Sequence, residues 1–243
     1  MTSRRKFIAS IPAAGSVLLT ACKDSLPPTF GSLFDASNSL TFASHRLLLR
    51  NQPLVREFAR DKITKNFPAI NETNPKSDRY QQLLAGGFTD WRLPIAGLVS
   101  RPIELSLETL KRFPSRTQVT QHNCEQGWSA IAEWTGVPLG RVLQEVGMLP
   151  QARYIVFHTV DGWWDSLDML DALHPQTLLA YGMNGGDLPV AHGAPVRLRV
   201  ERQLGYKSLK FLSRIDVTDR LDDVEDGTGA VGAAYGYSWY AGI

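Results

Sequence analysis

The chain has 243 residues, of which 43% are hydrophobic and 21% are charged, with 26 Lys and Arg against 24 Asp and Glu. This balance is typical of a folded globular protein and excludes an intrinsically disordered chain. The length favours one domain of about 200 residues with a hydrophobic core, no apolar run reaches the roughly eighteen residues of a membrane-spanning helix, and two cysteines cannot form a disulfide framework.

The first residues have the features of an export signal. Ser3-Arg4-Arg5-Lys6-Phe7-Ile8 holds the only charges of the first 22 residues, and the uncharged stretch over 7–21 ends in small residues. This order predicts a signal peptide rather than a membrane span. The paired arginines favour the twin-arginine kind, with an ordinary secretion leader as the alternative. Without the three basic residues of this segment, the chain has 23 basic and 24 acidic residues, so we expect no general attraction for nucleic acid.

A lipidation site follows the apolar stretch. Leu19-Thr20-Ala21-Cys22 resembles the processing site of bacterial lipoproteins, in which the cysteine becomes the acylated first residue. We therefore expect lipidation of Cys22, which would anchor the protein to a membrane; a cysteine that merely lies near an ordinary cleavage site is the alternative. The predicted organisation is a signal peptide over 1–21, a tether over 22–38 and one folded domain over 39–243, located in the periplasm.

The first half of the predicted domain combines helices with loops. The segment 40–67 favours helix, with a new start or a kink at Pro53. A loop rich in Asn and Pro follows over 68–77, and residues 91–97 favour a strand with a turn. Ser106 is expected to cap a short helix that runs to Arg112.

The second half is richer in strands. Strands are predicted over 116–120, 153–160, 196–200 and 211–217, and a helix over 138–146. The sequence Met183-Asn184-Gly185-Gly186-Asp187 favours a hairpin turn, and the aromatic-rich segment from Asp226 favours a packed irregular tail. Because strands and helices alternate without a regular βαβ order, we expect an α+β fold with a mixed β-sheet and short helices.

Few residues carry an obvious chemistry. The five histidines are scattered without zinc-ligand spacing, and neither a G-x-G-x-x-G nor a G-x-S-x-G motif occurs. Cys124 lies after a predicted strand, close to His122. It is either a thiolate metal ligand, a nucleophile beside His122, or a buried apolar side chain. His122 itself is either part of the site or a satisfied histidine at a strand end.

Three segments together resemble the sulfite oxidase superfamily. Cys124-Glu125-Gln126-Gly127-Trp128-Ser129, continued over 134–139, is similar to the molybdenum-binding segment of this family. Segments 181–198 and 205–211 follow in the family's order and spacing, and the resemblance covers residues 93–218. Within the superfamily it is most similar to the haem-free bacterial branch that includes the periplasmic protein-methionine-sulfoxide reductase catalytic subunit. The resemblance implies a sulfite-oxidase-type molybdopterin-binding fold.

The resemblance also implies a cofactor and its ligands. The expected cofactor is molybdenum–molybdopterin, with Cys124 as the protein's thiolate ligand to the metal and as the catalytic residue. Arg50 and Asn51 are candidates for contacts at the N-terminal end of the site. Without the resemblance, the basic side chains among the matched positions would equally suit a solvated surface. The residues that match the family's cofactor contacts are Thr159, His192, Arg197, Ser208 and Lys210.

The implied reaction is the two-electron transfer of an oxygen atom to or from a small substrate. Residues 126–129 lack the arginine pair that follows the thiolate in sulfite oxidases, which favours a sulfoxide over sulfite. The segment 161–165 either lines the pocket with aromatic side chains or is a packed surface loop. Because the chain has no haem or iron–sulfur motif, an electron-transfer partner is expected, either a membrane haem protein or a cytochrome. The alternatives are a sulfite-oxidising enzyme that passes electrons to a cytochrome, and a non-catalytic periplasmic binding lipoprotein.

Overall fold

The computed structural model describes residues 33–49, 51 and 53–243, so the predicted signal peptide and Cys22 lie outside the described residues. Within the described part of the chain, no helix is long and apolar enough to cross a bilayer. The α-helices are α2 (Leu33–Leu48), α3 (Asp78–Ala85), α4 (Leu107–Lys111), α5 (Leu139–Val146) and α6 (Met169–Ala172). The short 3-10 helices are η1 (Arg60–Lys62), η2 (Val190–His192), η3 (Gly205–Lys207) and η4 (Val231–Tyr235).

Two sheets form the body of the molecule. The first sheet has the order β2-β1-β10-β5-β6 and is mixed, because β1 and β10 are parallel while the other pairs are antiparallel. Its strands are β1 (Arg92–Gly97), β2 (Ile103–Ser106), β5 (Tyr154–Thr159), β6 (Trp164–Asp168) and β10 (Leu212–Thr218). The second sheet is antiparallel, with the order β3-β4-β7-β8 and with β9 beside β7. Its strands are β3 (Arg116–Asn123), β4 (Ser129–Pro138), β7 (Leu178–Met183), β8 (Gly186–Asp187) and β9 (Arg197–Arg199).

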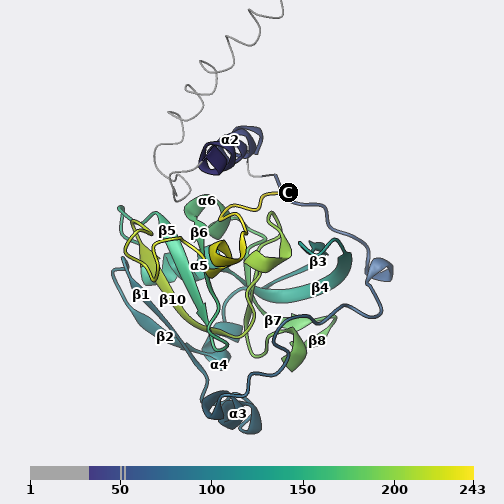
Figure 1. Ribbon diagram of the computed structural model, residues 1–243. Helices are drawn as coiled ribbons and strands as arrows, with labels where there is room; N and C mark the ends of the chain where they lie inside the picture. The colour runs from purple at the N-terminus through teal and green to yellow at the C-terminus, as the bar shows by residue number, and fades with distance from the viewer. Residues whose placement is uncertain (1–32, 50, 52) are drawn as a thin grey trace, which may run out of the picture.

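The sheets lie side by side, with α2 against α6 at one end of the molecule and α3 at the other (Figure 1). One large apolar core joins both sheets and α5, and its members include Ile95, Phe157 and Leu179, all fully buried. Burial of this much apolar surface is the main stabilising contribution to the fold. The prediction of an α+β fold with a mixed sheet and short helices is therefore confirmed.

Local sequence signals account for several element ends. The Ser106 hydroxyl accepts a hydrogen bond from the backbone N–H of Thr109 at 3.0 Å, so this residue caps α4 as predicted. Asn184 and Gly185 have φ angles of 52° and 83°, in the left-handed region that the tight β7–β8 turn requires. The predicted hairpin turn is therefore confirmed.

The helix predicted over 40–67 is wrong beyond residue 48. The backbone N–H of Phe58 donates to the carbonyl of Val119 at 2.9 Å, and that of Thr64 donates to Ile131 at 2.9 Å. These bonds hold an extended segment along the second sheet, so tertiary hydrogen bonds replace the helical ones. Helix α2 begins at Leu33 and crosses the predicted boundary between residues 38 and 39.

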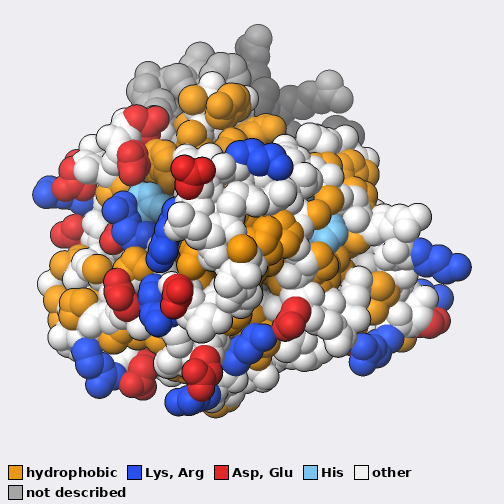
Figure 2. Space-filling model, turned by 90° about the horizontal axis from the view of Figure 1, so that it is seen from below, with side chains coloured by type: hydrophobic (Ala, Val, Ile, Leu, Met, Phe, Trp, Pro, Cys, Tyr) orange, Lys and Arg blue, Asp and Glu red, His pale blue; other side chains and the backbone are white. Residues whose placement is uncertain are grey.

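The C-terminal segment packs as an irregular tail, as predicted. Trp239 and Tyr240 are buried, whereas the Tyr235 side chain is 68% exposed. The Lys207 ammonium donates to the carbonyl of Trp239 at 2.8 Å and contacts the buried carboxylate of Asp165, which ties the tail to η3 and β6. Acidic and basic side chains are mixed over the surface seen in Figure 2, as expected from the balanced charge of the predicted domain.

Candidate active site

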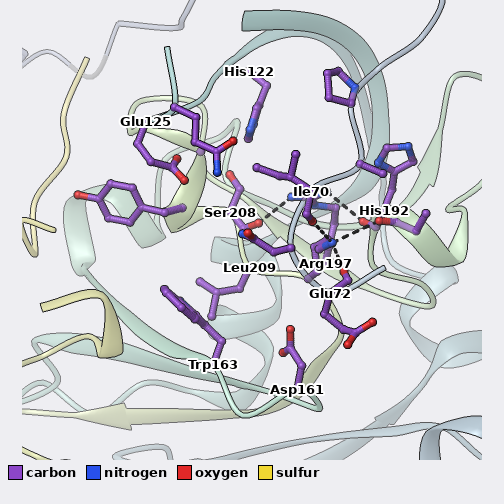
Figure 3. A pocket seen from close by; sticks show the side chains of 18 of the residues that line it. Ile70, Glu72, His122, Glu125, Asp161, Trp163, His192, Arg197, Ser208 and Leu209 are labelled. Atoms are coloured by element: carbon purple, nitrogen blue, oxygen red, sulfur yellow. Dashed lines mark hydrogen bonds between the residues drawn. The ribbon is translucent and has the colours of Figure 1, made fainter. Parts of the chain in front are cut away.

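A cavity of about 470 Å³ lies where loops from both sheets meet. In Figure 3, His122 and Glu125 lie on one side of it and Asp161 and Trp163 on the opposite side. Arg197 lies between them, on the wall that β9 forms. The segments that contribute to the wall lie within residues 67–72, 122–128, 159–163, 191–197, 205–210 and 235–237.

Cys124 lies directly after β3, in a tight turn. Its backbone N–H donates to the carbonyl of Trp128 at 2.9 Å, and Gly127 adopts a φ of 89° that closes the turn. The side chain is buried, and its neighbours His122 and Glu125 line the cavity although Cys124 itself does not. Burial raises the pKa of the Cys124 thiol, the backbone N–H of Gln126 opposes this increase, and the Glu125 carboxylate, 3.5 Å from Sγ, adds to it. A bound metal cation would supply the charge that stabilises the thiolate.

Arg197 is a buried cation on the cavity wall. Its Nη1 donates to the carbonyl of His192 at 3.0 Å and its Nη2 to the carbonyl of Ser208 at 2.7 Å, while Nε has no hydrogen-bond partner among the described residues. Burial and the neighbouring Arg199 lower the pKa of the guanidinium. Since an arginine stays protonated in proteins, its charge is held here without a hydrogen-bonded carboxylate. An anionic ligand in the cavity would compensate it.

Lys210 donates its hydrogen bonds to backbone carbonyls of the protein. Its ammonium donates to the carbonyls of Ile70 at 2.7 Å and Ala191 at 3.3 Å, and also to that of Glu72. Burial, followed by the charge of Arg197, lowers the pKa of Lys210 to about 8. In this structure Lys210 therefore ties the segment over 67–72 to the cavity wall.

The close approach of Lys210 to η2 depends on a glycine. Gly193 has a φ of 107°, and a Cβ at this position would come within 2.8 Å of the Lys210 Cβ. Only glycine meets both requirements without strain. This explains the glycine in the segment that resembles the family's second signature.

The remaining predicted cofactor contacts also lie on the wall. Burial, with the charges of Arg197 and Lys210, lowers the pKa of His192 to about 4, so its ring is neutral at pH 7. The Ser208 hydroxyl accepts from the backbone N–H of Val200 at 3.1 Å. The Thr159 hydroxyl lies 2.7 Å from the carbonyl of Trp163 and holds its own loop. The structure thus brings all five predicted residues to one cavity, while their roles as cofactor ligands stay predictions.

Several lining residues have no counterpart in the sequence predictions. The segment 67–72 forms one wall, although its Asn- and Pro-rich composition indicated only a loop. Tyr206, Tyr235 and Tyr237 also line the cavity. For Tyr235 and Tyr237, the aromatic-rich composition of the C-terminal segment was the one sequence signal. Asp161 and Trp163 line it as one predicted alternative had it. Arg50 lies outside the described residues, and Asn51 is exposed and does not line the cavity.

The residues present fit the implied cofactor. A phosphorylated pterin needs a cation and hydrogen-bond donors, and the Arg197 guanidinium on the cavity wall supplies the cation. A soft metal needs a sulfur ligand, and Cys124 is a free, buried thiol beside the wall. Arg197, His192 and Ser208 would hold the organic part, and Cys124 would ligate the metal.

Comparisons with known proteins agree with this geometry. Residues 82–224 match the family model of the oxidoreductase molybdopterin binding domain. A protein of Azospira oryzae with the provisional name protein-methionine-sulfoxide reductase subunit YedZ1 is 32% identical over 243 residues, which cover 100% of this chain and 88% of that protein. The protein-methionine-sulfoxide reductase catalytic subunit MsrP of Xanthomonas axonopodis pv. citri is 34% identical over 152 residues, covering 56% of this chain and 47% of the relative.

A solved structure shows the same architecture. The sulfane dehydrogenase SoxCD from Paracoccus pantotrophus superposes with a TM-score of 0.52 and 28% sequence identity, covering 59% of this chain and 40% of that one. The chain thus spans about half the length of the MsrP relative and less than half of the SoxCD chain.

Proposed function

The chain belongs to the oxidoreductase molybdopterin-binding family, within the sulfite oxidase superfamily, and we propose that it uses a molybdenum–molybdopterin cofactor to reduce a sulfoxide. Membership of this family makes the chain an oxidoreductase. The observation that carries the proposal is that the buried cation Arg197, which has no hydrogen-bonded carboxylate among the described residues, lines a cavity whose wall includes the neighbours of the buried thiol of Cys124. The cation suits an anionic organic cofactor and the thiol suits its metal.

The surface of the cavity favours an uncharged substrate over sulfite. Its two basic side chains, Arg197 and Lys210, already donate to carbonyl groups, and the acidic Glu72, Glu125 and Asp161 share the wall. A dianion would meet these carboxylates, whereas a sulfoxide is neutral. Aromatic side chains at the wall suit a sulfur-bearing group with an apolar body. The aromatic members are Phe67, Trp128, Trp163, Tyr206, Tyr235 and Tyr237.

The names of two relatives support the same substrate class, since both refer to protein-methionine-sulfoxide reductase. In the proposed reaction a sulfoxide loses its oxygen as water and becomes a thioether, consuming two electrons and two protons. When bound, the cofactor would supply the two-electron oxygen-atom-transfer chemistry. The chain's own residues hold the cofactor, exclude water from the cavity and orient the sulfoxide oxygen.

The electrons come from a separate one-electron donor, and we propose a membrane haem protein or a cytochrome. The proposed location is the periplasm, after export by the twin-arginine route and anchoring through lipid on Cys22. The basic pair before a short apolar stretch, and the small residues before Cys22, support this proposal.

The cofactor is tested by measuring molybdenum and pterin in protein purified from cells that make the cofactor. We expect about one metal per chain in the natural protein, and loss of the metal in Cys124→Ala, because the thiolate is the protein's one proposed bond to it. Cys124→Ser keeps the size of the side chain and serves as the matched variant. Natural protein without metal and pterin would contradict the proposal.

The substrate is tested by assaying sulfoxide reduction and sulfite oxidation side by side with artificial electron carriers. We expect turnover of dimethyl sulfoxide or methionine sulfoxide and little oxidation of sulfite. Efficient sulfite oxidation without sulfoxide reduction would show that the sulfite-oxidising alternative is correct.

A further inference from the structure

We propose that His122 binds the substrate oxygen through its Nε2–H, and that Arg199 is the positioning residue that holds His122 in this form. This inference rests on the proposed function for the class of substrate. It concerns two buried side chains that have no part in holding the cofactor as described above. Neither residue was assigned such a role from the sequence.

Strand β3 directs His122 toward the site. Side chains alternate along a strand, and Gln118, Thr120 and His122 are buried on the same side of β3. Cys124 follows at the next place in this alternation, directly after the strand. His122 is 8% exposed and lines the cavity, beside Glu125 in Figure 3.

The hydrogen bond from Arg199 determines which ring nitrogen carries the proton. The Arg199 Nη1 lies 2.8 Å from the His122 Nδ1. A guanidinium only donates hydrogen bonds, so Nδ1 must accept, and the proton of the ring must be on Nε2. The bond therefore also excludes the doubly protonated, cationic form of His122.

Arg199 itself is held in place from two sides. Its Nη2 donates to Glu201 Oε2 at 2.8 Å and its Nε to Glu201 Oε1 at 3.2 Å, and both side chains are at most 1% exposed. The guanidinium also stacks on Trp134, with 4.4 Å from Cζ to the ring centroid. Glu201 accepts a further hydrogen bond from Gln118 at 3.0 Å. Because the guanidinium of Arg199 is both ion-paired and stacked, it has little freedom to move, and its hydrogen bond to the His122 Nδ1 is maintained.

The packing of neighbouring residues also fixes the ring of His122. The ring packs against Phe67 and Trp128, with centroids 5.7 and 5.5 Å away, and these two rings also contact each other at 6.3 Å. A Cβ on Gly205 would lie 2.4 Å from Nε2, so only glycine leaves room for the ring. Among the described residues Nε2 has no hydrogen-bond partner, and a ligand in the cavity would satisfy it.

A neutral donor suits a sulfoxide better than sulfite. The sulfoxide oxygen is an uncharged acceptor, which a single N–H binds without the cost of burying another charge. The thioether product offers only a weak acceptor sulfur, so the bond is lost when the oxygen leaves as water. His122 would therefore strengthen binding of the substrate relative to the product.

The form of the ring is tested by NMR on the metal-loaded protein with isotope-labelled histidine. The chain has five histidines, and the signal that disappears in His122→Phe identifies the residue. We expect the natural protein to show neutral His122 with its proton on Nε2. A signal for the Nδ1–H form, or for the cationic ring, would overturn the proposal without using enzyme activity.

The role in binding is tested with His122→Phe, which keeps the ring packing, His122→Gln, which keeps an N–H donor, and His45→Phe on α2 as the control. For His122→Phe we expect natural metal and pterin content, a KM for the sulfoxide raised about tenfold, as loss of one hydrogen bond predicts, and a smaller change in kcat. His122→Gln should recover part of the KM, and the control should leave it unchanged.

Three other outcomes would overturn the assignment. Loss of metal and pterin in His122→Phe would mean that His122 holds the cofactor instead of the substrate. An unchanged KM in a sulfoxide-reducing enzyme would remove His122 from substrate binding while leaving the proposed function intact. Absence of sulfoxide reduction in fully loaded natural protein would overturn the proposed function as well as this inference.

Discussion

Two buried arginines lie in contrasting surroundings. Arg46, on α2, donates to Asp168 at 2.6 Å and to Asp171 at 2.9 and 3.1 Å. Arg197, on β9, donates only to backbone carbonyls. In the part of the chain that the structure describes, neither Nε has a hydrogen-bond partner, so this feature does not distinguish them. Burial lowers the pKa of both, but the two carboxylates raise that of Arg46 above its ordinary value, whereas Arg199 lowers that of Arg197 further.

The contrast separates a structural cation from a ligand-binding one. At Arg46 the protein supplies the countercharge itself, and the resulting ion pairs attach α2 to the end of β6 and to α6 (Figure 1). At Arg197 no carboxylate among the described residues accepts a hydrogen bond from the guanidinium, the nearby Glu201 is paired with Arg199, and a cavity lies beside Arg197. A buried charge without compensation costs free energy. An anionic ligand bound beside Arg197 would offset this cost.

The largest effect is expected at the compensated arginine. Arg46→Met should lower the free energy of unfolding by about 3–5 kcal/mol, because it removes the cation that is hydrogen-bonded to two buried carboxylates and leaves only the longer ion pair of Asp171 with Arg202, at 3.9 Å. Urea unfolding of the purified chain measures this. The variant that also carries Asp168→Asn and Asp171→Asn removes the stranded charges and should recover part of the loss. An Arg46→Met protein as stable as the natural one would contradict the interpretation of this cluster.

A smaller, pH-dependent effect is expected at Lys210, which lines the same cavity as Arg197 and likewise donates to backbone carbonyls. Its pKa in the folded chain is about 8, against an ordinary value of 10.5. Between these values the unfolded chain binds more protons than the folded chain, so this group makes the free energy of unfolding rise with pH. The rise should be about 1 kcal/mol, since solvent screens a partly exposed ammonium.

The measurement compares urea unfolding of cofactor-free natural protein and Lys210→Met from pH 7.5 to about 10.5. The difference between the two curves isolates Lys210 from other titrating groups. It should grow in favour of the natural protein as pH increases. A difference that is constant across this range would show that Lys210 has an ordinary pKa.

The smallest change in stability is expected at Arg197, and it gives the sharpest contrast with Arg46. In the cofactor-free protein Arg197→Met should change the free energy of unfolding by less than about 1 kcal/mol, because removal of an uncompensated charge offsets the loss of two hydrogen bonds. Pterin and molybdenum content should nevertheless fall strongly. A stability loss as large as that of Arg46→Met, with natural cofactor content, would make Arg197 a structural residue.

Local patterns predicted the parts of the fold that depend on neighbouring residues. The cap at Ser106, the turn at Asn184-Gly185 and the buried strand around Phe157 were predicted correctly. Strands β2, β4 and β6 were not predicted, although each pairs with the strand directly before it in the chain. Strand β7 was not predicted because its pairing with β4 joins segments that are distant in the sequence. The helix expected beyond residue 48 is absent for the same reason, since this segment bonds to the second sheet.

The site shows the same division. Cys124 and the five predicted cofactor residues could be named because their segments resemble a known family. The opposing wall over 67–72 and the tyrosines of the tail have no local signature, and only the folded chain brings them to the cavity.

The sequence by itself therefore determined the family, the α+β class and the identity of the thiol, because short motifs and local preferences carry that information. Only the tertiary structure decided which charges are compensated. Residues 77 positions apart, such as His122 and Arg199, meet through sheet packing. That contact determines which nitrogen of the His122 ring carries the proton, and no sequence pattern predicts it.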